Sequence, residues 1–295
     1  MRHKPVPPGE GVLLVPTGSK RDAAAALGMY PACRWYSSLA QRGAFAGVRV
    51  LGPGAIPGRV LEWEPPVSVD CWSTLVEGAR SVLGEFTSMA VHLRRPQGRD
   101  GVTLFLIRDG APLGFVKLRR SPARGIDTER QVLELLARNR PRRFRAPEAL
   151  AHGECDGWSY LVVSSIADGL HRVPGRFDFQ GLQDEMSSIL SGGLTRPADL
   201  PAHWVPIHGD LTPWNLRRTR GGLILLDWEE TSWGPAGADL AWYDLAVEGG
   251  RLDTATTGLT HPQEVYRFWL DRVGAKPAED APTPEVLGLL RRLAH

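Results

Sequence analysis

The amino-acid sequence predicts an α+β fold with two parts, a strand-rich first half and a mainly helical second half. Two observations lead to this class. Three apolar strand segments follow one another between Phe86 and Leu118, and beyond Phe177 the chain is mostly helical and loop-like apart from one hairpin. Strands that come first and helices that come later favour α+β over a doubly wound parallel sheet.

The bulk composition is that of a folded protein rather than a disordered one. A length of 295 residues suits two domains or one bilobal unit, with 42% apolar and 23% charged residues. A formal net charge of +2 gives no reason to expect a nucleic-acid or membrane partner. No apolar run reaches the length of a membrane span, and the N-terminus lacks the apolar region of a secretory signal.

The cysteine pattern argues against a disulfide framework and against a zinc site. Cys33, Cys71 and Cys155 are odd in number, far apart and form no C-x-x-C motif. This usage is typical of a reducing compartment, so we expect a cytoplasmic protein without disulfides.

The first stretch, Met1 to Pro66, is rich in glycine and proline and its role is left open. It holds an apolar run at Val12–Val15 and a helical segment at Arg21–Met29. The segment PTGSK at Pro16–Lys20 lacks the G-x-x-x-x-G-K-[ST] spacing of a phosphate loop, so we do not expect phosphate binding there.

The next segments predict a short helix over Ser73–Gly84 and then three strands. The strands are Phe86–Leu93, Val102–Ile107 and Leu113–Leu118, and the Asp-Gly pair between the last two is a strong hairpin signal. Further segments are a helix with Asp127 as N-cap that ends near Asn139–Pro141, a strand at Tyr160–Val163, and a hairpin of Asn215–Arg218 with Leu223–Leu226.

The residues with the clearest chemistry lie in V-P-I-H-G-D-L-T-P-W-N-L, Val205–Leu216. Asn215 follows Asp210 by five residues, and Asp227 follows Asn215 by twelve, across the predicted hairpin. Phosphoryl transfer needs a carboxylate beside the attacking hydroxyl and hard oxygen ligands for magnesium. Asp210, Asn215 and Asp227 supply such a set of oxygen donors.

These motifs resemble the aminoglycoside phosphotransferase and choline kinase-like family, a branch of the protein-kinase-like fold. The family's loop reads H-G-D-x-x-x-x-N, and here His208-Gly209-Asp210 precedes Asn215, a strand-Asp-Trp and then Asp239-Leu-Ala. The resemblance implies that Asp210 is the catalytic base and that Asn215 and Asp227 bind magnesium. It also implies that Asp239 braces the catalytic loop and that His208 is structural.

The resemblance extends to a nucleotide site in the first half. Lys117 on the third strand would grip the α- and β-phosphates of ATP, held by Glu129 twelve residues on, with Glu134 as the rival partner. The loop that contains Gly98 would cover the phosphates, although it is not a G-x-G-x-x-G.

Two further assignments keep alternatives open. Backbone groups near Ser164 and Ser165 fall where the family's hinge binds adenine, and an ordinary buried strand explains the same residues. Glu229, two residues after Asp227, either extends the metal site or lies in solvent.

The resemblance implies a bilobal protein-kinase-like fold with an N-terminal extension. The expected parts are an extension over 1–80, a small antiparallel-sheet N-lobe over 81–166 and a mainly helical C-lobe over 167–295. Only 43 residues separate Ser165 from His208, which suggests an open acceptor side and an acceptor larger than a compact antibiotic.

The predicted function is ATP-dependent transfer of the γ-phosphate to a hydroxyl of a small-molecule or glycan-type acceptor, with ATP and Mg²⁺ as cofactors. The alternative is a nucleotide-binding regulatory module with weak or no turnover, which the atypical phosphate loop favours. His-Gly-Asp in place of His-Arg-Asp argues against a protein kinase, and the basic runs contain no recognisable nucleic-acid module. The acceptor, the choice of ATP or GTP and the oligomeric state are left open.

Overall fold

The structure is a computed structural model that describes residues 1–6, 13–29, 32–93, 101–165, 171–252, 254, 256, 258–276 and 282–295. The chain divides into two compact units, and each is described by itself. Unit 1 comprises Met1–Ala32, Tyr36–Ile126 and Pro147–His171, and unit 2 comprises Cys33–Trp35, Asp127–Ala146 and Arg172–His295.

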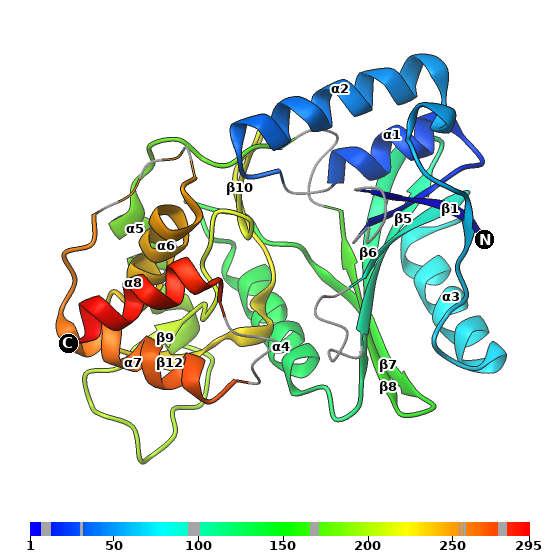
Figure 1. Cartoon of the computed structure of the whole chain (residues 1–295). Helices are drawn as coiled ribbons and strands as arrows, with labels where there is room; N and C mark the ends of the chain where they lie inside the picture. Colours follow the sequence, from blue (N-terminus) through cyan, green and yellow to red (C-terminus); the bar gives the residue numbers. More distant parts are fainter. Residues whose placement is uncertain are drawn as a thin grey trace. The chain divides into compact units, whose positions relative to one another are not determined.

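Unit 1 is built on an eight-stranded sheet with the order β3-β1-β2-β4-β5-β6-β8-β7 (Figure 1). All of its neighbouring strands pair antiparallel. The strands are β1 (Arg2–Val6), β2 (Leu13–Pro16), β3 (Leu61–Glu62), β4 (Ser88–Leu93), β5 (Gly101–Arg108), β6 (Ala111–Arg120), β7 (Ala149–Cys155) and β8 (Trp158–Ser164).

The three consecutive strands predicted between Phe86 and Leu118 are confirmed as β4, β5 and β6. The tight turn between β5 and β6 is also as predicted, since Asp109 and Gly110 both have positive φ, 53° and 83°. This is the backbone of a two-residue hairpin turn whose twist suits antiparallel strands.

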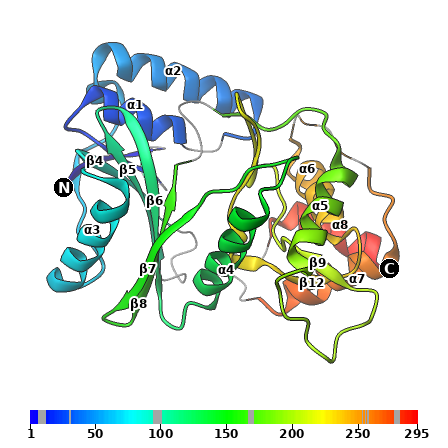
Figure 2. The ribbon, with the colours of Figure 1, turned by 180° about the vertical axis from the view of Figure 1, so that it is seen from behind.

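Helices cover both faces of this sheet (Figures 1 and 2). Because successive strand residues point to opposite faces, Leu104 and Leu106 of β5 pack toward α3 (Val69–Leu83), whereas Phe105 and Ile107 pack toward α1 (Lys20–Met29) and α2 (Trp35–Leu51). Two apolar clusters therefore form, one on each face of the sheet, and a short 3₁₀ turn, η1 (Pro53–Ala55), follows α2.

The residues expected to form a separate N-terminal extension belong to the same sheet. β2 pairs with β4 through Leu13 with His92 and Leu14 with Val91, and β1 pairs with both β2 and β3. The structure thus differs from the expected boundary at residue 80. β1 and β3 are short and carry charged residues, so local pattern gave no sign that they extend the sheet.

A disulfide joins Cys71, in the first turn of α3, to Cys155 at the end of β7, with the two Cα atoms 5.5 Å apart. The expectation of no disulfide is therefore wrong, and the cysteine argument for a reducing compartment is lost with it. The two cysteines are 84 residues apart, and only the sheet brings them together, so no local spacing indicated the pair.

Unit 2 is mainly helical. Its elements are most of α4 (Arg124–Asn139), α5 (Phe179–Ser191), α6 (Ala238–Gly250), α7 (Gln263–Gly274), α8 (Pro284–Ala294), the 3₁₀ turn η2 (Trp228–Glu230), and the strands β9 (Val205–Ile207), β10 (Leu216–Thr219), β11 (Gly222–Leu225) and β12 (Ser232–Gly234). Helices α6, α7 and α8 share one apolar core that includes Leu245, Trp269 and Leu290.

The predicted hairpin is confirmed, because β10 and β11 pair antiparallel, and β9 pairs separately with β12. Helix α4 begins at Arg124, three residues before the expected N-cap, so Asp127 lies in its first turn, where an acidic residue suits the helix dipole. No helix in the described parts of the chain is long and apolar enough to cross a membrane.

The α+β class is confirmed by a first unit that holds an antiparallel sheet and a second that is mainly helical. The same division into a sheet-containing N-lobe and a helical C-lobe is what the resemblance to the protein-kinase-like fold implies.

Cys71→Ser should destabilise unit 1, because the disulfide closes a loop of 84 residues in the unfolded chain. The chain-entropy argument sets an upper limit of about 4–5 kcal/mol on the loss. Urea unfolding of the parent with and without reductant measures it, and Cys33→Ser should retain the parent's sensitivity to reductant. The disulfide is contradicted if reductant does not change the unfolding midpoint of the parent and if thiol titration of the native parent finds three free thiols.

Candidate active site

A buried carboxylate from α6 fixes the loop that follows β9. Asp239 accepts hydrogen bonds from the backbone N–H of His208 at 2.7 Å and of Gly209 at 3.0 Å. Burial raises the pKa of Asp239 to about 6, although these two hydrogen bonds act in the opposite direction. Asp239 therefore holds the backbone of this loop in place through two hydrogen bonds, as the resemblance implies.

His208 links this loop to the end of β11. Its Nδ1 accepts a hydrogen bond from the N–H of Asp210 at 3.2 Å, so Nε2 carries the proton and donates to the carbonyl of Leu226 at 2.9 Å. The ring is fully buried and packs on Trp228 with centroids 4.5 Å apart. The neutral imidazole therefore sets the spacing between Asp210 and the residue before Asp227, a structural role.

Gly209 is required by a close backbone approach. Its φ is +81°, and a Cβ atom built there would lie 2.0 Å from the carbonyl oxygen of Glu230 in η2. Any side chain would push the loop away from η2. The glycine of the H-G-D motif thus permits the contact that brings the loop next to the segment after Asp227.

Asp210 and Asn215 contact each other directly. The amide Nδ2 of Asn215 donates to Asp210 Oδ2 at 2.8 Å and to the Asp210 carbonyl at 2.9 Å. Trp242 on α6 donates its Nε1–H to Asp210 Oδ1 at 3.2 Å. Because Nδ2 of Asn215 points at Asp210, the oxygen Oδ1 of Asn215 is the atom that can bind a metal.

The environment of Asp210 favours its neutral form. Burial and then the nearby negative charge of Asp227 raise the pKa of Asp210 to about 7 from 3.8, and the hydrogen bond from Trp242 acts against the rise. A carboxyl group with a pKa close to neutral is well matched to accept a proton during catalysis.

Three carboxylates meet where β11 ends. One oxygen each of Glu129, Asp227 and Glu229 lies within 4.8 Å of the other two. The N–H of Leu226 donates to the carbonyl of Asn215 at 2.9 Å, which joins this cluster to the Asp210 loop. Asp227 itself adopts a left-handed backbone, with φ 63° and ψ 70°. Closely spaced hard oxygen donors are the ligand set that magnesium prefers, so these residues fit a divalent cation.

The structure changes the expected surroundings of Glu129 and Glu229. Glu129 is buried in unit 2 and accepts a hydrogen bond from the N–H of Trp228 at 3.4 Å, beside Asp227. Glu229 lies in a 3₁₀ turn rather than in an extended segment, and it joins the carboxylate cluster. The rival residue Glu134 forms an ion pair with Arg130 at 2.8 Å, one helical turn away.

The other predicted nucleotide-site residues lie in unit 1 or outside the described residues. Lys117 is on β6, opposite Thr103 of β5, and its pairing with Glu129 stays a prediction because the two belong to different units. The N–H of Ser164 donates to the carbonyl of Glu148 and that of Ser165 to the carbonyl of Leu113, so both N–H groups already have partners within unit 1. Gly98 lies outside the described residues.

Sequence reasoning missed two groups around the site. Trp242 follows Asp239 by three residues, and in a helix this spacing places both side chains on one face. The sequence pattern therefore indicated that Trp242 lies on the same side of α6 as Asp239. Glu230 is held by ion pairs with Arg272 at 3.1 Å and Lys276 at 3.0 Å, which arise only from the packing of α7 and carry no local signal.

A family model matches part of unit 2. The model of the phosphotransferase enzyme family matches residues 194–257, about a fifth of the chain, and this span contains Asp210, Asn215, Asp227 and Asp239. The match confirms the predicted resemblance to the aminoglycoside phosphotransferase and choline kinase-like family. A search of curated proteins finds no match to the chain.

Solved structures of similar fold include three kinds of phosphotransferase. A fructosamine-3-kinase from Haemophilus somnus 129PT is 11% identical, with 76% of this chain and 98% of the other covered and a TM-score of 0.44. Wild-type aminoglycoside 2'-phosphotransferase-IIIa in complex with GDP is 14% identical, with 77% and 97% covered and a TM-score of 0.44. A choline/ethanolamine kinase family protein from Mesorhizobium loti is 15% identical, with 75% and 94% covered and a TM-score of 0.38.

Asp210→Asn should gain stability relative to the parent as the pH rises from about 4 to about 7 without metal. The unfolded carboxyl ionises near 3.8 but the folded one only near 7, so the folded parent binds the extra proton throughout this window. The parent's unfolding free energy should therefore fall relative to the variant, with a slope that approaches about 1.4 kcal/mol per pH unit. Urea unfolding in chelator across this range measures it, and a stability difference that does not change with pH refutes the assignment.

Gly209→Ala should destabilise unit 2 by at least about 2 kcal/mol, because the new Cβ meets the Glu230 carbonyl and the backbone stays at positive φ. Gly274→Ala at the end of α7 is the matched control, since nothing lies within 4 Å of a Cβ there. Thermal unfolding of both variants makes the comparison, and equal unfolding temperatures for the two contradict the close contact between the loop and η2.

Proposed function

We propose that this protein is a magnesium- and ATP-dependent phosphotransferase that phosphorylates a hydroxyl group of its acceptor. The observation that carries the proposal is the convergence of Asp210 and Asn215, in contact at 2.8 Å, with the carboxylate cluster of Glu129, Asp227 and Glu229. A base, an amide oxygen and a compact set of carboxylates are what phosphoryl transfer to a hydroxyl demands of a protein.

Asp210 is the proposed catalytic base. Its carboxylate is oriented by Asn215 and Trp242 and would take the acceptor's proton as the hydroxyl oxygen attacks phosphorus. The loop that carries it is held by Asp239 and His208, so the base is positioned before the acceptor arrives.

Asp227, Glu129, Glu229 and Oδ1 of Asn215 would hold the magnesium ion. When bound, the ion supplies positive charge that neutralises the phosphate oxygens and the developing negative charge of the transition state. In the metal-free protein burial, and then the charge of Asp227, raise the pKa of Asp210. The chemistry of these donors therefore supports a divalent cation over a purely structural role.

The nucleotide contacts from unit 1 complete the proposal. Lys117 would bind the α- and β-phosphates, Gly98 would lie in the covering loop, and the carbonyls near Ser164 and Ser165 would contact adenine. Lys117 is half-buried on β6, and its chain neighbours Val116 and Leu118 are buried. This partial burial supports a role for Lys117 in binding phosphate.

The acceptor is proposed to be a small molecule or glycan-type compound, without a nucleic-acid partner. Between residues 171 and 205 the chain contributes one helix, α5, which is consistent with the short connection noted in the sequence and with an open acceptor side. We also propose a cytoplasmic location, where the nucleotide is available.

Asp210→Asn should reduce phosphate transfer by roughly 10²–10⁴-fold, because it removes the base, while leaving ATP affinity nearly unchanged. Asp227→Asn should instead weaken binding of Mg²⁺–ATP by at least about tenfold, since it removes a charge that faces the metal. Turnover of labelled ATP, with and without a panel of hydroxyl acceptors, and calorimetric titration with Mg²⁺–ATP measure the two effects.

Asp184→Asn on the exposed face of α5 is the control, and it should behave like the parent in both assays. Parent-like turnover by Asp210→Asn would refute the role of Asp210. Tight Mg²⁺–ATP binding by the parent with no turnover across the whole acceptor panel would favour the nucleotide-binding regulatory module instead.

A further inference from the structure

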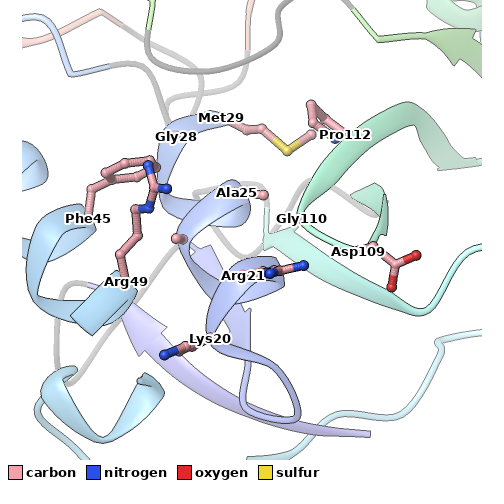
Figure 3. Close-up of a pocket in the computed structure, with 11 residues that line it drawn as sticks. Lys20, Arg21, Ala25, Gly28, Met29, Phe45, Arg49, Asp109, Gly110 and Pro112 are labelled. Carbon is pink, nitrogen blue, oxygen red and sulfur yellow. The ribbon is translucent and has the colours of Figure 1, made fainter. Parts of the chain in front are cut away.

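Unit 1 contains a cavity of about 550 Å³ where α1, α2 and the β5–β6 turn meet (Figure 3). Its apolar wall is formed by Ala25, Gly28 and Met29 of α1, Phe45 of α2 and Pro112 of β6. In Figure 3, Met29 points across the opening toward Pro112. The volume lies within the range of small-molecule binding sites, and the wall suits a compact apolar group.

The rim of this cavity is strongly positive. Among the described residues that line it, Lys20, Arg21 and Arg49 are cationic and only Asp109 is acidic. Within the described parts of the chain none of the three cations forms an ion pair, although Arg49 packs over the ring of Phe45 at 5.7 Å. Their charge is therefore available to an anion at the mouth.

The cavity is built on a fixed frame rather than on loose side chains. Buried Asp22 of α1 accepts hydrogen bonds from the N–H of Gly110 at 2.6 Å, from Ser88 Oγ at 2.8 Å and from Thr87 Oγ1 at 3.2 Å. These bonds tie α1 to the β5–β6 turn. Gly110 also lies so close to Arg21 that a Cβ there would be 2.9 Å from that of Arg21.

This cavity lies apart from Lys117, the proposed phosphate contact of unit 1, while its lining residue Pro112 is next to Leu113, whose carbonyl accepts a hydrogen bond from Ser165. Lys117 pairs with Thr103 near the start of β5, whereas the cavity is lined by Asp109 and Gly110, which follow the end of that strand. Six residues of extended strand separate Thr103 from Asp109, a distance of about 20 Å. The cavity therefore lies at the opposite end of the strand from Lys117.

We propose that this cavity binds a small organic anion, with an apolar group against Met29, Phe45 and Pro112 and a phosphate or carboxylate at the rim of Lys20, Arg21 and Arg49. An apolar wall favours a carbon body over a free inorganic ion, and three cations against one carboxylate favour an anion over a neutral or cationic compound. Most of the lining comes from residues 20–49, so the site gives a function to the N-terminal segment that the catalytic chemistry does not use.

The test is a ¹⁹F NMR titration of the full chain with 4-fluorophenyl phosphate, in the absence of metal and nucleotide. We expect saturable binding of this probe with a dissociation constant below about 1 mM. Inorganic phosphate and benzyl alcohol should compete with the probe only with dissociation constants at least about tenfold higher. Arg49→Glu and Arg21→Glu, both exposed, should each weaken binding by about fivefold or more. Ala25→Phe, which fills the cavity from α1, should abolish it.

Arg42→Glu is the matched control, because Arg42 is an exposed arginine of α2 that does not line the cavity. It should leave binding unchanged. The proposal is overturned by an absence of binding in the parent, by equal losses in Arg42→Glu and Arg49→Glu, or by displacement of the probe by a non-hydrolysable ATP analogue. Asp210→Asn should bind the probe like the parent, so failure of the catalytic proposal and failure of this one are separable.

Discussion

The negative charge gathered around Asp227 is the constraint on which the rest of the site depends. Glu129, Asp227 and Glu229 place carboxylate oxygens within 4.8 Å of one another, and the charge of Asp227 also reaches Asp210. Such an arrangement is unfavourable by itself, because like charges held close in a partly buried site repel. We propose that a divalent cation offsets this repulsion.

The surrounding structure holds the loop that carries Asp210 in place through hydrogen bonds and one close backbone contact. Neutral His208 spans the catalytic loop and the end of β11, Asp239 binds two backbone N–H groups, and Gly209 lets the loop touch η2. Glu230, a further carboxylate nearby, forms ion pairs with Arg272 and Lys276. These contacts fix the loop and η2 next to the carboxylate cluster.

Local patterns in the sequence predicted what is local in the structure. The β4–β6 meander, its Asp-Gly turn and the loop with Asp210 and Asn215 were all readable, because each depends on residues within one or two turns or strands. Three features could not be predicted from local patterns, because each joins segments that only the completed fold brings together. They are the pairing of β2 with β4, the Cys71–Cys155 bond and the position of Glu129 beside Asp227. The cysteine count was misleading for the same reason.

We propose that Glu129, Asn215, Asp227 and Glu229 hold a divalent cation next to Asp210. Diffraction from crystals grown with Mn²⁺ and a non-hydrolysable ATP analogue tests it most directly, because manganese is located by its anomalous signal. We expect an anomalous peak about 2.0–2.3 Å from a carboxylate oxygen of Asp227, with the manganese ion also coordinated by Asn215. Bound nucleotide whose manganese lies away from Asp227 and Asn215 would contradict it.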